Sequence, residues 1–249
     1  MKLLVINPNT SQFVTDKLSA TVSAAADSGV KVTAVTGRKG PPIVGTRAEC
    51  AIAAVEAMEL AVEHGQDADA ILLGISFDTG LDAIREVMPM PVVGMSEAGM
   101  LAATTLARSF SMVTFGDRAV PIYDELIAHY RLSGRSAGTV SLPPLSLQEL
   151  QDPMLIVDRL AAKINQTAAQ NGAESVVLAG AVFAGIAPVL KDRVSIPVVD
   201  GIVAGVGLLQ MLHQLNTAKP KQGSYRYPAA KTLTGMSDAM TRHFQELPD

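Results

Sequence analysis

The sequence predicts an α/β protein made of two pseudo-symmetric units with mainly parallel sheets, and a site in the cleft between the units. The first observation behind this prediction is the order of patterns. Runs rich in β-formers alternate with helical runs as βαβαβα, twice, which is typical of parallel strands with helices on both faces. The second is an internal repeat: the stretch 70–94 returns after 106 residues, with Gly74 on Gly180 and Phe77 on Phe183. A repeat of this length is too long for a solenoid and indicates two copies of one unit.

The repeat also divides the chain. We expect a first unit of residues 1–97 and 203–249 and a second unit of residues 98–202, so that the end of the chain returns to the first unit. Because ligands bind outside the carboxyl ends of strands in open parallel sheets, the site is expected where the strand ends of the two units face each other.

The first unit is expected to contain four strands, each followed by a helix. Its strands are predicted at residues 2–6, 31–36, 70–75 and 91–94, and its helices at 11–26, 47–64, 80–87 and 96–107. A loop rich in glycine and proline joins the second strand to the second helix. Loops of this length at a strand's carboxyl end often cover a site.

The second unit restarts the pattern with a strand at 110–113. A helix at 120–130, a β-like segment at 133–144 and a long amphipathic helix at 152–170 follow, and then comes the second copy of the repeat. An apolar helix from 202 to about 215, directly after Asp200-Gly201, and a terminal helix at 236–245 close the chain.

Composition narrows the function classes. With 48% hydrophobic and 18% charged residues, the 249-residue chain can bury a large core. A net charge of −4 with scattered basic residues argues against nucleic acid as a partner, and the absence of tryptophan argues against stacking platforms. The single Cys50 excludes an intrachain disulfide, and no Cys/His pattern indicates zinc.

Location and assembly follow from the apolar runs. The first residues lack a signal-peptide pattern and no apolar run reaches membrane-spanning length, so we expect a cytoplasmic protein without a membrane partner. The apolar stretch 202–212 favours a homo-oligomer, although a buried core helix explains it equally well.

The candidate site residues stand at the strand ends. Residues 76–80 follow the central strand of the first unit, and 181–185 take the equivalent place in the second. The first turn carries polar side chains and the second does not. Asn9 and Thr10 end the opening strand beside a helix start that can aim its amides at an anion.

Several of these residues also have structural readings. Asp78 can cap the helix that follows it, and Glu49 and Glu97 are expected to be structural first-turn acids, Glu97 next to Ser96 as a cap. Arg47 could bind a carboxylate through its planar fork or form a solvated pair. Cys50 lies in an apolar neighbourhood and is expected to be a structural thiol.

At these motifs the chain resembles the aspartate/glutamate/hydantoin racemase superfamily, most closely its hydantoin and allantoin racemase branch. The resemblance covers nearly the whole chain, and it rests on the residues Asn7-Pro8-Asn9-Thr10, Gly74-Ile75-Ser76-Phe77-Asp78-Thr79-Gly80-Leu81, Pro91-Val92-Val93-Gly94 with Glu97-Ala98, Val113-Thr114-Phe115 and Ile196-Pro197-Val198-Val199-Asp200-Gly201.

The resemblance implies a cofactor-free, two-base mechanism in which one cysteine from each unit flanks the substrate. The first cysteine of the family pattern falls on Ser76, and the second falls around Gly180-Ala181-Val182, where no side chain ionises. A serine hydroxyl needs an activating partner to act as a base, and Asp78, Glu49 or Tyr123 could provide one. Alternatively, Ser76 only donates a hydrogen bond to a ligand.

Three functional readings stay open. The first is a racemase or isomerase acting on a small carboxylate or a cyclic ureide such as a hydantoin or allantoin. The others are a one-sided lyase, decarboxylase or hydrolase that uses Ser76, and a non-catalytic binder of a small molecule. Ser76 is the predicted catalytic residue, and the predicted substrate-binding residues are Asn9, Thr10, Arg47, Phe77, Asp78, Thr79, Thr114, Phe115, Tyr123, Gly180, Ala181, Val182 and Phe183.

Overall fold

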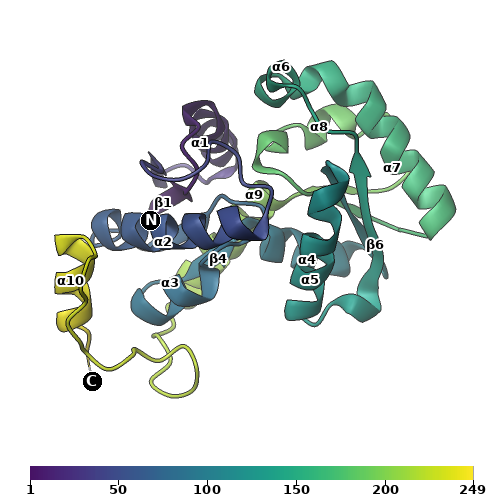
Figure 1. The fold of residues 1–249 in the computed structure, drawn as a ribbon. Coiled ribbons are helices and arrows are strands. Elements are labelled where there is room, and N and C mark those ends of the chain that lie inside the picture. The colour runs from purple at the N-terminus through teal and green to yellow at the C-terminus, as the bar shows by residue number, and fades with distance from the viewer. Residues whose placement is uncertain (249) are drawn as a thin grey trace.

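The computed structural model describes residues 1–248, which fold into two four-stranded parallel sheets with helices around them, as the sequence predicts (Figure 1). The last residue of the expected first unit, Asp249, lies outside the described residues. None of the helices in residues 1–248 has the length and apolar character needed to cross a membrane.

The first sheet has the strand order β2-β1-β3-β4. Its strands are β1 (Lys2–Asn7), β2 (Lys31–Thr36), β3 (Ala70–Leu73) and β4 (Val92–Gly94). Its helices are α1 (Gln12–Ala25), α2 (Arg47–His64), α3 (Leu81–Val87) and α4 (Met95–Leu106). All residues of β3 are buried, because helices cover both faces of the sheet.

The second sheet repeats this order as β6-β5-β7-β8. Its strands are β5 (Phe110–Phe115), β6 (Ser136–Leu142), β7 (Val176–Leu178) and β8 (Val198–Asp200). Its helices are α5 (Val120–His129), α6 (Leu147–Gln151), α7 (Val157–Asn171) and α8 (Ala187–Leu190), and the short 3-10 turn η4 (Ala181–Phe183) follows β7. The central strand of each sheet is therefore followed by the turn that the internal repeat predicts.

The chain ends on the first sheet. Helix α9 (Gly201–Leu215) contacts α4, α1 and β3, and α10 (Asp238–Gln245) packs on α2, at the yellow end of the chain in Figure 1. These contacts support the division at residues 97 and 202, which we retain as a proposal.

Two expected helix starts are wrong. The helix expected at 152–170 is broken, because Asp152 caps a 3-10 turn at Pro153–Ile156 and α7 begins only at Val157; the short α6 before it was not expected. Ser96 does not cap α4, which begins after Gly94 with Ser96 inside its first turn.

Candidate functional site

A cavity of about 80 Å³ lies where the loops after β1, β3, β5 and β7 meet. Nine of the predicted site residues line it: Asn9, Ser76, Phe77, Thr114, Phe115, Tyr123, Gly180, Ala181 and Val182. Strand ends from both sheets thus contribute to a single hollow, at the edge that the parallel topology favours.

The polar wall of the cavity centres on Ser76, in the turn after β3. Its hydroxyl oxygen lies 2.6 Å from the hydroxyl oxygen of Tyr123 on α5, and both residues are buried, with 7% and 2% of their surface exposed. The carbonyl oxygen of Ser76 accepts a hydrogen bond of 2.5 Å from Ser96. The Ser76 backbone and hydroxyl are therefore both fixed, by partners from different elements.

Tyr123 is held by its ring as well as its hydroxyl. The ring packs against Phe77 with centroids 4.6 Å apart. Burial raises the pKa of the Tyr123 phenol, and hydrogen bonds with Ser76 and Thr114 oppose that rise. The phenol is therefore neutral at pH 7. Among the described residues that line the cavity, Tyr123 is the only one with an ionisable side chain.

The opposite wall is apolar and follows β7. Gly180 has φ +151°, and a Cβ atom there would lie 3.0 Å from the Phe115 ring, so both conformation and space favour glycine. No described residue accepts a hydrogen bond from the backbone amides of Ala181 or Val182. This wall can offer backbone donors to a ligand, but it has no acid or base.

Asn9 brings a side-chain amide to the cavity. Its Oδ1 accepts hydrogen bonds from Asn7 Nδ2 at 3.0 Å and from the Ser11 amide at 2.9 Å. Within the described residues its Nδ2 makes no hydrogen bond, which leaves two N–H donors for a ligand.

The glycine and proline loop after β2 covers the cavity, as its length predicts. Ile43, Val44 and Gly45 line the hollow from this loop. The loop is tied down by the Ser11 hydroxyl, which donates to the Pro42 carbonyl at 2.6 Å, and by the Gly45 amide, which donates to the Glu49 carboxylate at 2.8 Å. Glu49 therefore has the structural role expected of it.

Other predicted residues do not line the cavity: Thr10, Arg47, Asp78, Thr79 and Phe183. Arg47 forms an exposed ion pair with Glu125, the solvated alternative, and the Thr10 amide donates to the Pro41 carbonyl. Cys50 is half-buried against the apolar cluster behind Phe77, outside the cavity, and burial raises the pKa of its thiol. A cysteine of this kind is poorly suited to be a nucleophile.

The apolar part of the lining was missed in the sequence. It consists of Val14, Ile43, Val44, Ile75 and Ala119. These side chains resemble ordinary core residues. The position of Ile75 beside Ser76, and that of Ile43 and Val44 in the loop expected to cover the site, could have indicated them.

Asp78 has a structural role that differs from the expected one. It does not cap α3, whose N-cap is Gly80. Its carboxylate instead accepts hydrogen bonds from the Ser96 and Glu97 amides, at 3.0 and 2.7 Å, and from the Tyr130 hydroxyl at 2.8 Å. Asp78 thus joins the turn after β3 to the start of α4 and the end of α5.

The stability of the protein is expected to depend on pH through Asp78. Burial raises the pKa of this carboxyl to about 7, so the folded chain binds the proton more tightly than the unfolded chain. The stabilisation is complete below about pH 4 and is lost as the pH rises to about 7, an effect on the order of a few kcal/mol. In the Asp78→Asn variant, the free energy of unfolding measured with urea should change much less between these pH values than in the wild type.

Two comparisons isolate this effect. Burial also raises the pKa of Asp200, which the variant retains, so the difference between the two chains reports on Asp78 alone. The exposed Asp67→Asn is the matched control and should leave the pH dependence unchanged. A wild-type slope that survives Asp78→Asn would contradict the assignment.

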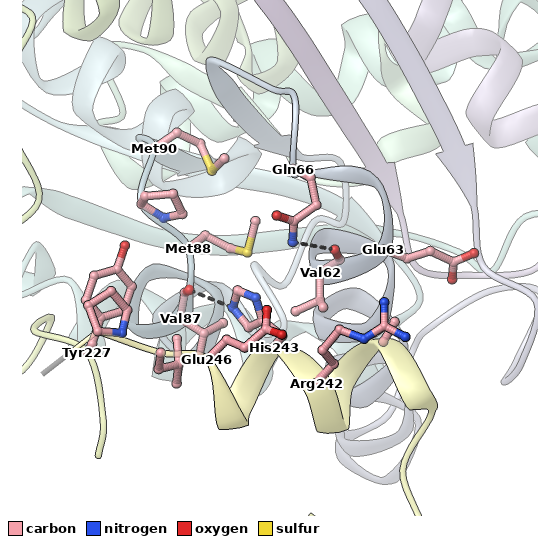
Figure 2. Close-up of a pocket in the computed structure, with 15 residues that line it drawn as sticks. Val62, Glu63, Gln66, Val87, Met88, Met90, Tyr227, Arg242, His243 and Glu246 are labelled. Carbon is pink, nitrogen blue, oxygen red and sulfur yellow. Dashed lines mark hydrogen bonds between the residues drawn. The ribbon is translucent and has the colours of Figure 1, made fainter. Parts of the chain in front are cut away.

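A larger hollow of about 510 Å³ lies away from the strand ends, between α2, the turn after α3 and α10 (Figure 2). His243 Nε2 lies 2.9 Å from the Val87 carbonyl there, and Gln66 donates to Val62. Its charged residues include Glu63, which pairs with Arg38. No predicted site residue lines this hollow, so we place the chemistry in the smaller cavity.

Comparison with known proteins shows which proteins this chain is similar to. A model described as Asp/Glu/Hydantoin racemase matches residues 3–209. A hydantoin racemase from Pseudomonas sp. (strain NS671) is 29% identical over 246 residues, 98% of each chain. The structure of an allantoin racemase from Klebsiella pneumoniae is 30% identical, with a TM-score of 0.89 and 98% of each chain covered. That of an allantoin racemase from Pseudomonas fluorescens is 26% identical, with a TM-score of 0.90, covering 94% of this chain and all of the other.

Proposed function

The chain belongs to the Asp/Glu/hydantoin racemase family and is an enzyme of that family, and we propose that it transfers a proton at the carbon beside a carbonyl group of a small cyclic ureide or carboxylate. The substrate would bind in the 80 Å³ cavity, and the reaction would need no cofactor. The observation that carries the proposal is the buried Ser76–Tyr123 hydroxyl pair on one wall of that cavity.

The remaining polar groups fit a ligand that carries a carbonyl or carboxylate group. The Asn9 side-chain amide and the Ala181 and Val182 backbone amides are hydrogen-bond donors around an otherwise apolar hollow. Donors aimed at a carbonyl oxygen stabilise the enolate that forms when the neighbouring carbon loses a proton or a carboxyl group. Because the hollow is buried, each of these hydrogen bonds gains strength from the low local dielectric.

Deuterium exchange tests the proposal. The chain is incubated in D₂O with 5-methylhydantoin, allantoin or methylmalonate, and the products are followed by NMR and polarimetry. Deuterium at the carbon beside the carbonyl is the expected result, and loss of optical rotation for the chiral probes would show that the proton returns to both faces of that carbon. A chain that neither exchanges the proton nor changes the optical rotation would not be a racemase.

The difference between the two walls of the cavity, one with hydroxyl groups and the other apolar, favours a second candidate function, decarboxylation. A neutral phenol behind a serine hydroxyl is a proton donor, and the facing wall has no base to remove a proton from carbon. Loss of CO₂ generates a carbanion without a base, and this carbanion needs only the donor. Release of CO₂ from methylmalonate, giving one enantiomer in the case of ethylmethylmalonate, would support this candidate over racemisation.

Small substituents on the substrate are expected to be preferred. The cavity volume of about 80 Å³ is roughly half that of a cavity that holds benzene. We expect kcat/KM for 5-methylhydantoin to exceed that for 5-benzylhydantoin about tenfold or more. Ile43→Ala on the covering loop should reduce this ratio, whereas Val55→Ala, an exposed residue of α2 outside the cavity, should not. Equal rates for the two hydantoins would contradict the small cavity.

Exposed apolar side chains support the expected homo-oligomer. Leu101 and Leu106 on α4 and Val203, Met211 and Leu215 on α9 are all between 44% and 62% exposed. A surface of this kind on two adjacent helices fits self-association.

A further inference from the structure

Ser76 cannot exchange protons efficiently by itself. A serine hydroxyl is both a weak acid and a weak base, and it becomes useful in catalysis only when a neighbouring group takes or supplies its proton. Within the described residues, no histidine, carboxylate or amine lines the cavity. The Asp78 carboxylate, two residues away, is occupied by two amides and Tyr130.

Among the described residues, Tyr123 is the ionisable group whose side chain is in position to act on the Ser76 hydroxyl. Its hydroxyl oxygen is 2.6 Å from Ser76 Oγ, within the range of a strong hydrogen bond between hydroxyl groups. Its ring is fixed against Phe77, and the surrounding cluster includes Phe110, Met112 and Ile127. A phenylalanine would satisfy this apolar environment, so the cluster gives no reason for a hydroxyl at this position. The hydroxyl meets only Ser76 and Thr114 at the cavity wall.

We propose that Tyr123 is a positioning residue that supplies protons to the substrate through Ser76 Oγ. In this relay, a residue of the second unit passes protons to the turn after β3 in the first unit. This inference rests on the proposed function and names the group that completes it. It needs no thiol, and it places both relay members on one wall of the cavity.

The proton balance is simple. The enolate carbon takes the Ser76 hydroxyl proton, a C–H bond forms, and Ser76 Oγ takes the Tyr123 phenol proton. Solvent then restores the phenol. In decarboxylation, the electron pair of the broken C–C bond becomes the enolate, CO₂ leaves, and one solvent proton is consumed. In exchange, the substrate C–H proton travels the same path backwards, which requires the Tyr123 phenolate.

Tyr123→Phe, which keeps the ring, tests the relay by turnover. We expect kcat to fall about 10- to 100-fold with KM within threefold, because the hydroxyl acts on the proton and not on binding. Exchange into 5-methylhydantoin should accelerate with pH in the wild type as the phenolate forms, and should lose this enzymatic pH dependence in the variant. A variant with kcat within threefold of the wild type and the same pH profile would overturn the relay.

A second measurement separates failure of the relay from failure of the proposed function. Barbiturate, a cyclic ureide that is an enolate anion at neutral pH, is added to the chain labelled with ¹³C at the tyrosine ζ carbon, with Tyr123→Phe identifying the Tyr123 signal. We expect this signal to shift in the wild type and to shift much less in Ser76→Ala. No shift in the wild type, or the same shift without Ser76, would overturn the relay even for a chain that turns over none of the substrates.

Discussion

Ser76→Ala is expected to lower kcat/KM about 10²- to 10⁴-fold on the substrate that the wild type uses, with the fold unchanged. The substitution removes the hydroxyl on the cavity wall that lies 2.6 Å from the Tyr123 hydroxyl, so the substrate loses its proton donor. The backbone of the turn should persist, because the Ser76 carbonyl still accepts the hydrogen bond from Ser96. Steady-state rates and far-ultraviolet circular dichroism, measured together, check both parts.

Ser76→Cys is the matched variant for this experiment. A thiol is a better proton donor than an alcohol and exchanges protons near neutral pH. We expect it to restore at least a tenth of the wild-type turnover and to raise exchange into hydantoins relative to methylmalonate. If Ser76→Ala retains full turnover on the true substrate, the site does not depend on this hydroxyl and the assignment is wrong.

The fold could be predicted because its signals are local. The strand at 31–36 and the helix at 47–64 have the bounds that the sequence indicates, and α9 begins at Gly201, one residue before its expected start. For the two helices, apolar spacing and a capping residue lie within a few positions of each other: Thr46 caps α2 through the Glu49 amide, and Asp200 caps α9. The break before α7 was missed because a helical apolar pattern continues through Pro153.

The site was predictable only where topology decides it. Parallel strand order brings Ser76 and Gly180 to the same edge, and an internal repeat is enough to infer that. The Asp78 carboxylate is different, because its partners at Ser96 and Tyr130 are 18 and 52 residues away. Contacts between residues so far apart in the sequence direct the Asp78 side chain to α4. No local sequence pattern distinguishes this arrangement from one in which the Asp78 carboxylate caps α3. The 2.6 Å contact of Tyr123 with Ser76 likewise joins residues that are far apart in the sequence, at a separation of 47 positions.

The close approach of α4 and α9 leads to the largest expected effect on stability. A Cβ atom at Gly201 would lie 2.2 Å from the Met95 carbonyl oxygen, and backbone atoms cannot move aside as a flexible side chain can. Gly201→Ala should therefore push the start of α4 away from Asp78, whose carboxylate binds the amides of Ser96 and Glu97. We expect a loss of about 3 kcal/mol in the free energy of unfolding.

Gly207→Ala in the same helix separates this clash from the general effect of alanine. A Cβ atom at Gly207 meets nothing within 4 Å, so the substitution should stabilise the chain by about 0.5–1 kcal/mol through helix propensity alone. Urea unfolding of both variants, with an unchanged dependence of the unfolding free energy on urea concentration, measures the difference in their stability. Helix propensity contributes equally to the two variants and therefore cancels in this difference. Since the first turn of α4 also fixes the Ser76 carbonyl through Ser96, Gly201→Ala should reduce turnover as well as stability. Two variants of equal stability would mean that α4 can yield to a methyl group, and the rigid link from α9 to the Ser76 turn would then be absent.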